Sequence, residues 1–132
     1  MVWSYADIGI DLGTERVRVV VRGRGVVIDE PSAVAVDRQT GLFVAAGCQA
    51  EELAADNPYK FVRLRPLSSG VVGRYDCALM LLRSVMSRAL GGRSLARPRV
   101  IMSIVARPSQ VEKRTWLQVA IESGARATAL VE

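Results

Sequence analysis

Histidine is absent from this sequence, and its absence excludes several kinds of site at once. Without an imidazole there is no serine–histidine or cysteine–histidine nucleophile pair and no histidine-ligated metal centre. Aromatic residues are also scarce, at 5% of the chain, so aliphatic side chains must fill the core. Half of the residues are hydrophobic and 23% are charged, which is typical of a globular domain.

Cysteines are few, and long apolar runs are missing. The two cysteines, Cys48 and Cys77, form no CxxC pattern, and residues 1–5 lack the basic and apolar regions of a secretory signal. We therefore expect both thiols to be reduced, buried and inert in a cytoplasmic chain. The longest uncharged apolar stretches, residues 77–82 and 100–106, are far shorter than the ~20 residues of a membrane span.

Positive charge is plentiful and unevenly spread. The 132 residues carry a net charge of +5. No acidic residue lies between Asp76 and Glu112, whereas six arginines do. Such a field favours an anionic surface, either lipid or nucleic acid, and a solvated basic face is the alternative interpretation.

The first part of the chain reads as short strands joined by turns. Residues 8–12, 17–22 and 26–28 predict three antiparallel strands, with a turn at residues 22–25. Residues 34–36 and 42–46 predict a hairpin, and residues 50–55 a short helix that Asn57 and Pro58 end. Residues 60–66 and 68–70 are expected to form an extended polar connection.

The second part of the chain alternates helix and strand. Asp76 is expected to cap a helix that ends at residues 91–92. Residues 100–105 are uniformly apolar, which predicts a strand buried on both faces. Ser109 and Glu112 form a capping box for a helix that runs to Ser123, and residues 128–131 form a last strand. This strand–helix–strand order implies a parallel pair, so the predicted fold class is α/β.

The segment Ile8-Gly9-Ile10-Asp11-Leu12-Gly13-Thr14 is the first candidate site. Gly13 lets the backbone approach a phosphate, and the amides that follow it can point at phosphate oxygens. Asp11 at the end of the strand can hold hydrated Mg²⁺. As a bare pattern, however, the same string is typical of ordinary hairpins.

Residues 7–14 resemble the first phosphate loop of the actin and heat-shock-chaperone ATPase superfamily. Further strings, in order and spacing, are similar to the MreB family of bacterial actin homologues. They are Gly23-Arg24-Gly25-Val26-Val27, Asp29-Glu30-Pro31-Ser32, Arg65-Pro66-Leu67, Gly70-Val71-Val72, Arg97-Pro98-Arg99-Val100 and Val111-Glu112-Lys113-Arg114. The resemblance covers residues 7–132, and several separated motifs in register are more specific than one glycine loop.

The resemblance implies an actin-like ATPase (ribonuclease H-like) first domain, with residues 1–30 and 76–132 as subdomain IA and residues 31–75 as an inserted subdomain IB. It further implies ATP and Mg²⁺ as cofactors, with Asp11 near the metal and Gly13, Thr14, Glu15 and Arg16 at the phosphates. Family members form filaments on the inner face of the cell membrane and organise cell-wall synthesis. Filament subunits, an anionic membrane and the cell-wall machinery are therefore the expected partners.

Three departures from the family pattern bear on the site. Where the family has Thr-Ala-Asn, this chain has Thr14-Glu15-Arg16, which places a carboxylate near the phosphates and an arginine able to pair with them. The turn at residues 106–109 also differs. The sequence stops at Glu132, where the resemblance calls for a second glutamate that positions the hydrolytic water, a second phosphate loop and a second domain. Hydrolysis by this chain alone is therefore not expected.

The predicted membrane contact has its own residues. The family's membrane loop corresponds to residues 93–97, where Leu95 lies between Arg93 and Arg97, and Trp3 is expected near it. Each base close to an anionic surface adds about 1 kcal/mol. The alternative is that Leu95 and Trp3 pack into the domain. For the apolar positions of the last helix (Trp116, Leu117, Val119, Ala120 and Ile121), core packing is the favoured interpretation.

Three functional hypotheses remain at this point. The first is an MreB-like cytoskeletal protein that determines cell shape and self-associates, since a parallel sheet ending at Val131 leaves an edge or a face uncovered. The second is a fragment of a longer ATP-hydrolysing protein. The third is a nucleic-acid-binding module using residues 83–107, which is disfavoured because no aromatic stacking residue is interleaved there.

Overall fold

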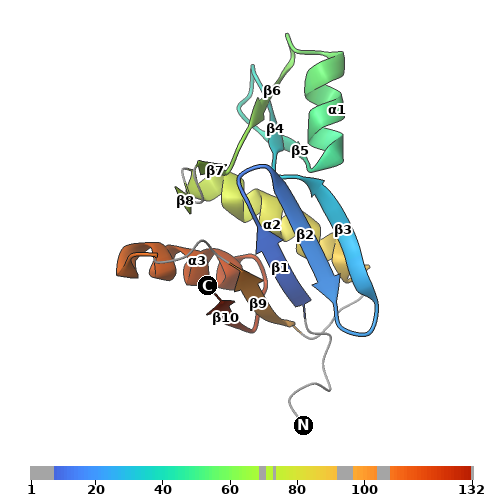
Figure 1. Cartoon of the computed structure of the whole chain (residues 1–132). Helices are drawn as coiled ribbons and strands as arrows, with labels where there is room; N and C mark the ends of the chain where they lie inside the picture. Colours follow the sequence, from blue (N-terminus) through green and yellow to red (C-terminus); the bar gives the residue numbers. More distant parts are fainter. Residues whose placement is uncertain (1–7, 69–70, 73, 92–96, 104–107, 132) are drawn as a thin grey trace.

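Two sheets of different size organise the chain (Figure 1), whose computed structural model describes residues 8–68, 71–72, 74–91, 97–103 and 108–131. The larger sheet has five strands in the order β10-β9-β1-β2-β3, and the smaller has three in the order β5-β4-β6. The strands of the larger sheet are β1 (Ile8–Leu12), β2 (Arg16–Val21), β3 (Gly25–Pro31), β9 (Arg99–Ser103) and β10 (Ala127–Val131).

The five-stranded sheet has the mixed topology that the sequence predicts. Strand β2 is antiparallel to both β1 and β3, whereas β9 is parallel to both β1 and β10. Helix α3 (Gln110–Glu122) connects β9 to β10, which confirms the strand–helix–strand unit. The carboxyl ends of β1, β9 and β10 therefore meet at one edge of the sheet.

Only one face of this sheet is covered by the described helices. Alternate residues of β1, β2 and β9 join side chains of α2 (Tyr75–Ala89) and α3 in a single core. The intervening side chains face outward, and Val20 and Ile101 are 41% and 39% exposed. The prediction of a strand at residues 100–105 buried on both faces is therefore wrong, because α2 and α3 pack on the same side.

The smaller sheet and α1 form a separate layer, which we call the inserted unit (residues 34–64). It contains β4 (Val34–Asp37), β5 (Phe43–Ala46), α1 (Cys48–Asp56) and β6 (Phe61–Leu64). The hairpin is confirmed, because β4 pairs antiparallel with β5. Residues 61–64, expected to be a connection, instead pair with β4 as a third strand. A short two-stranded pair, β7 (Leu67–Ser68) and β8 (Val71–Val72), leads into α2.

The beginnings of the two long helices differ in how well local sequence marks them. The capping box of α3 is confirmed, with the Ser109 hydroxyl accepting from the Glu112 amide at 3.1 Å and the Glu112 carboxylate accepting from the Ser109 amide at 3.3 Å. Helix α2 begins two residues earlier than expected, with Arg74 rather than Asp76 as its N-cap. Asp76 lies in the first turn instead, where it accepts from the Cys77 amide at 2.8 Å.

The cysteine and core predictions are partly correct. Cys77 is buried, and burial raises the pKa of its thiol to about 11, which keeps it protonated at neutral pH. Cys48 is exposed at the start of α1, so the prediction that both thiols are buried is wrong. On α3, Trp116, Val119 and Ala120 are buried, whereas Leu117 and Ile121 face solvent, because the sheet covers only one side of this helix. No described helix is both long and apolar enough to cross a membrane.

Candidate functional site

Asp11 lies near the carboxyl end of β1, on the face of the large sheet that the described helices leave open. It is aligned with Ser103 of β9 and with Arg18 of β2. A hollow of about 280 Å³ opens on this face and is lined by Asp11, Arg18, Val20, Ile101, Ser103 and their neighbours. Sequence reasoning placed Asp11 at a site, and the structure places it in this sheet-face hollow.

The carboxylate of Asp11 is exposed, and no hydrogen bond or ion pair joins it to another described residue. Within the same residues, no group of three or more potential metal ligands occurs. A single carboxylate fits Mg²⁺ that keeps most of its water and takes further oxygens from phosphates. It does not fit a metal held by protein groups alone.

The turn between β1 and β2, residues 13–16, is a tight hairpin. The Gly13 amide donates to the Arg16 carbonyl at 2.9 Å, and a Cβ at Gly13 would lie 3.3 Å from that same oxygen. This close packing accounts for the glycine without any ligand. Among the described residues, none accepts a hydrogen bond from the Glu15 amide. That amide is therefore available to an anion.

Glu15 and Arg16, the two residues that depart from the family pattern in the turn after β1, both have partners within the structure. The Glu15 carboxylate pairs with Arg65 at 3.1 Å. The Arg16 guanidinium donates to the Asp29 carboxylate at 2.8 Å and to the Asp29 carbonyl at 3.0 Å. This hydrogen bond from Arg16, assisted by Arg18 and only partly opposed by burial, holds the pKa of Asp29 below its usual value. Arg16 is thus engaged with Asp29 rather than directed at the turn amides.

These residues fit the phosphate and metal end of a Mg²⁺-nucleotide. They offer an exposed carboxylate, a turn amide without an acceptor, and an acidic side chain already paired with an arginine. The roles of Asp11, Gly13, Thr14, Glu15 and Arg16 at a nucleotide stay predictions.

The predicted membrane residues fall mostly outside the described part of the chain. Trp3, Arg93 and Leu95 lie there, so their surroundings are not described. Arg97 is described and exposed. The membrane contact through these residues therefore stays a prediction.

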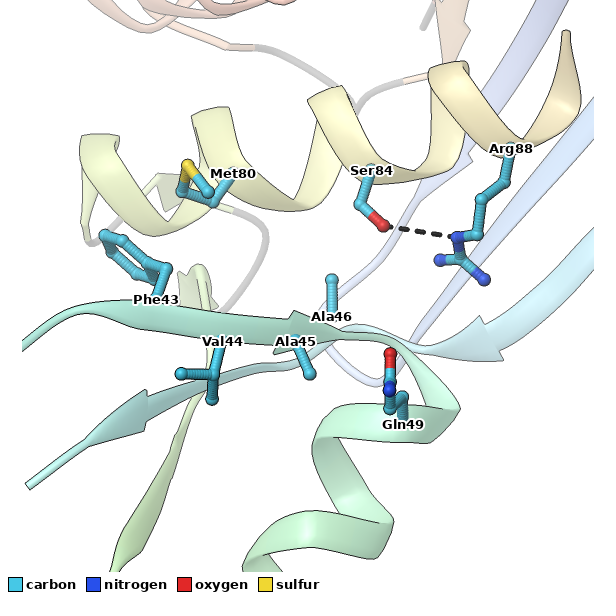
Figure 2. A pocket seen from close by; sticks show the side chains of 8 residues that line it. All are labelled: Phe43, Val44, Ala45, Ala46, Gln49, Met80, Ser84 and Arg88. Carbon is cyan, nitrogen blue, oxygen red and sulfur yellow. Dashed lines mark hydrogen bonds between the residues drawn. The ribbon is translucent and has the colours of Figure 1, made fainter. Parts of the chain in front are cut away.

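A second hollow, also of about 280 Å³, separates β5 and the start of α1 from α2 (Figure 2). Phe43 and Met80 lie at one end, and Ser84 and Arg88 at the other. Arg88 donates to the Glu30 carboxylate at 2.7 Å, and Glu30 also accepts from the Cys48 amide at 3.3 Å. These contacts make Glu30 a junction between the large sheet, α2 and the inserted unit.

Sequence reasoning missed Glu30, Arg88 and Arg65 as structural partners. Glu30 and Arg65 belong to strings that carry the family resemblance, but nothing in those strings says which residue each one meets. Glu30 bonds to Arg88, which is 58 positions away, and Arg65 donates to the Thr14 carbonyl, which is 51 positions away.

The fold is that of the first domain of actin-like proteins. The structure of MreB5 of Spiroplasma citri bound to ADP superposes with a TM-score of 0.84 at 28% identity, covering 98% of this chain and 38% of that one. The MamK double helical filament has a TM-score of 0.80 over 95% of this chain and 40% of that one, and its 22% identity shows a shared fold alone.

The family model for MreB/Mbl protein matches residues 5–132, and the chain therefore belongs to the MreB/Mbl family. The cell shape-determining protein Mbl of Bacillus cereus is 33% identical over 126 residues, which cover 96% of this chain and 38% of Mbl. The chain thus spans less than two fifths of the length of this curated relative.

Proposed function

We propose that this chain is the phosphate-binding portion of a cell-shape-determining protein of the actin type, which binds ATP with Mg²⁺ through Asp11 and the turn at residues 13–16. The observation that carries the proposal is the exposed carboxylate of Asp11 near the end of β1, beside the turn that carries the Glu15 amide. Neither the carboxylate nor the amide has a partner among the described residues. MreB5, which shares the fold at 28% identity, was solved with ADP bound.

Each residue has a distinct part in this proposal. The Glu15 amide donates to a phosphate oxygen, and Gly13 allows the tight turn that presents it. Asp11 holds Mg²⁺ through water, so that the cation neutralises the phosphates beside it. Thr14 and Arg16 flank the phosphates. Arg16 can exchange its partner Asp29 for a phosphate, because the side chains of Arg16 and Asp29 are both about half exposed. The proposal concerns binding, since phosphoryl transfer needs further groups around the γ-phosphate.

The direct test is titration calorimetry with Mg-ATP, comparing the wild-type chain with Asp11→Ala and Asp56→Ala. Asp56 is an exposed aspartate at the end of α1, so its replacement makes the same change of charge away from the site. We expect Asp11→Ala to weaken binding about tenfold or more, and removal of Mg²⁺ to have a similar effect. Equal affinities for the two variants would refute the role of Asp11.

We further propose that the chain assembles with copies of itself or with longer MreB/Mbl subunits at the inner face of the cell membrane, where the cell-wall machinery operates. Mbl relatives are named for determining cell shape, and MamK, which shares the fold, forms a double helical filament. Co-sedimentation with purified Mbl of Bacillus subtilis tests assembly. The assembly proposal would be contradicted if the chain is absent from the pellet at every ratio of chain to Mbl and is a stable monomer on its own.

Flotation with anionic and neutral vesicles tests the membrane contact. Leu95→Ser should reduce binding to the anionic vesicles, whereas Leu42→Ser, at an exposed position between β4 and β5, should not. Binding to DNA but not to anionic vesicles would instead favour the nucleic-acid alternative.

A further inference from the structure

Both connections that link the large sheet to the inserted unit contact the β1–β2 turn. Ser32, where the chain enters the inserted unit, donates its amide to the Glu15 carbonyl at 2.9 Å. Arg65, where the chain leaves it, donates from Nη1 to the Thr14 carbonyl at 3.1 Å. The carbonyls of two successive turn residues are therefore held from the side of the inserted unit.

The contact of Arg65 orients a particular peptide group. The Thr14 carbonyl and the Glu15 amide belong to one planar trans peptide, so the C=O and N–H bonds point in opposite directions. When Arg65 holds the carbonyl, the Glu15 N–H points away from the guanidinium. This is the turn amide for which no acceptor occurs in the described part of the chain.

Arg65 also forms an ion pair with Glu15, the acidic side chain of the turn. Its guanidinium lies 3.1 Å from the Glu15 carboxylate, and the Arg65 side chain is only 33% exposed. Without Arg65, the carboxylate would be unpaired close to any bound phosphate and would repel it. One nitrogen of Arg65, Nη1, thus lies at 3.1 Å from both a carbonyl and a carboxylate of the same turn.

We infer that Arg65 is a positioning residue for the phosphate-binding turn, holding the Thr14–Glu15 peptide and the Glu15 carboxylate so that the Glu15 amide is presented to an anion. The inference rests on the proposed nucleotide function. Arg65 directly follows β6, the last strand of the inserted unit. The geometry of the turn therefore also depends on the position of the inserted unit relative to the large sheet.

The experiment compares Arg65→Gln with Arg63→Gln in Mg-ATP titrations of the whole chain. Arg63 is a matched control: it lies two residues away, is 38% exposed and pairs with Glu51 at 2.8 Å, with no contact to the turn in the structure. Arg65→Gln should weaken binding about tenfold, and Arg63→Gln by less than about twofold. Equal losses would mean that only net charge matters and would overturn the inference.

Two further variants separate orientation from charge. Glu15→Gln in the Arg65→Gln background should restore about threefold of the affinity, since it removes the repulsion but not the misorientation. Arg65→Lys should retain part of the affinity, because an ammonium keeps the positive charge beside the Glu15 carboxylate but lacks the planar, rigid guanidinium that orients the peptide. Complete recovery by Glu15→Gln would refute the orientation of the peptide by Arg65. Far-UV circular dichroism confirms that each variant is folded.

A measurement without nucleotide distinguishes failure of this inference from failure of the proposed function. The NMR order parameter of the Glu15 amide should fall from about 0.85 to below about 0.6 in Arg65→Gln and stay unchanged in Arg63→Gln. If wild type does not bind Mg-ATP, the nucleotide proposal fails, and this measurement still decides whether Arg65 holds the turn. An unchanged order parameter in Arg65→Gln would overturn the inference.

Discussion

Replacement of Gly47 by alanine tests the junction between the large sheet and the inserted unit. Gly47 is the N-cap of α1 and has φ 69° and ψ −138°, a conformation that L-residues rarely adopt. A Cβ at this position would lie 1.8 Å from Glu30 Oε1 and 3.3 Å from Arg88 Nη2. The Glu30 carboxylate must therefore move, and it then loses its hydrogen bonds from Arg88 and the Cys48 amide.

The size of the effect follows from two contributions. The backbone conformation, which lies in a sparsely populated region, costs a non-glycine residue about 1–3 kcal/mol. Displacement of Glu30 removes charge-assisted hydrogen bonds worth about 1–2 kcal/mol, after allowance for the 41% exposure of Arg88. We expect Gly47→Ala to lower the free energy of unfolding by about 2–5 kcal/mol, a large fraction of the total of about 5–15 kcal/mol for a domain.

Urea denaturation followed by circular dichroism measures this loss. With a slope of about 2 kcal/mol per molar urea, the midpoint should fall by about 1–2.5 M. Gly41→Ala is the matched control, because Gly41 also has a positive φ of 75° but nothing lies within 4 Å of its added Cβ. It should show the cost of a Cβ at a positive φ without the displacement of a carboxylate.

The Glu30→Ala background isolates the steric part of the effect. In that background Gly47→Ala should cost less than in the wild-type background, since the carboxylate that it displaces is gone. The reasoning would be refuted if Gly47→Ala and Gly41→Ala were equally destabilising in the wild-type background. It would also be refuted if the cost of Gly47→Ala did not depend on Glu30.

Two other predictions concern α3 and its contact with α2. Burial, together with a hydrogen bond to the Glu122 carboxylate, raises the pKa of Tyr75 to about 12 from the usual 10.0 of a tyrosine. Because the folded state favours the protonated phenol, this contribution to stability is fully present below pH 10 and is lost as the pH rises through about 12. An ultraviolet absorbance titration should show one late tyrosine step that Tyr75→Phe removes and Tyr59→Phe leaves, and its survival in Tyr75→Phe would disprove the assignment. Ser109→Ala should lower the free energy of unfolding by about 1 kcal/mol, because it removes the capping box that Ser109 forms with Glu112. Ser109→Thr should keep most of that stability. If urea denaturation shows equal losses of stability in the two variants, the cap does not stabilise α3.

The parts of the fold that short-range patterns specify were predictable. The alternation of apolar residues in β2 gave its buried face, and Ser109 with Glu112 marked the beginning of α3. Strand β6 was not predictable in the same way. Its sequence is short and interrupted by Arg63, and it becomes a strand because β4 offers an unpaired edge beside it.

The burial of β9 shows the same limit. A run of apolar residues is equally compatible with cover on one face or on both, and only the packing of α2 and α3 decides between them. Asp11 could be proposed from its position at a strand end. That it makes no ion pair within the described residues, while Arg16 and Glu15 both do, depends on side chains from other strands.

The sequence by itself determined the strands of the large sheet, the helices that pack against it and the turn after β1. Through several motifs in register, it also determined membership of the MreB/Mbl family. The tertiary structure alone decided that Arg65 meets the turn and that Glu30 meets Arg88, across separations of 51 and 58 residues. The reason is physical: helix capping, turn formation and apolar periodicity act within a few residues, whereas the partner of a charged side chain is set by which elements the core packs side by side.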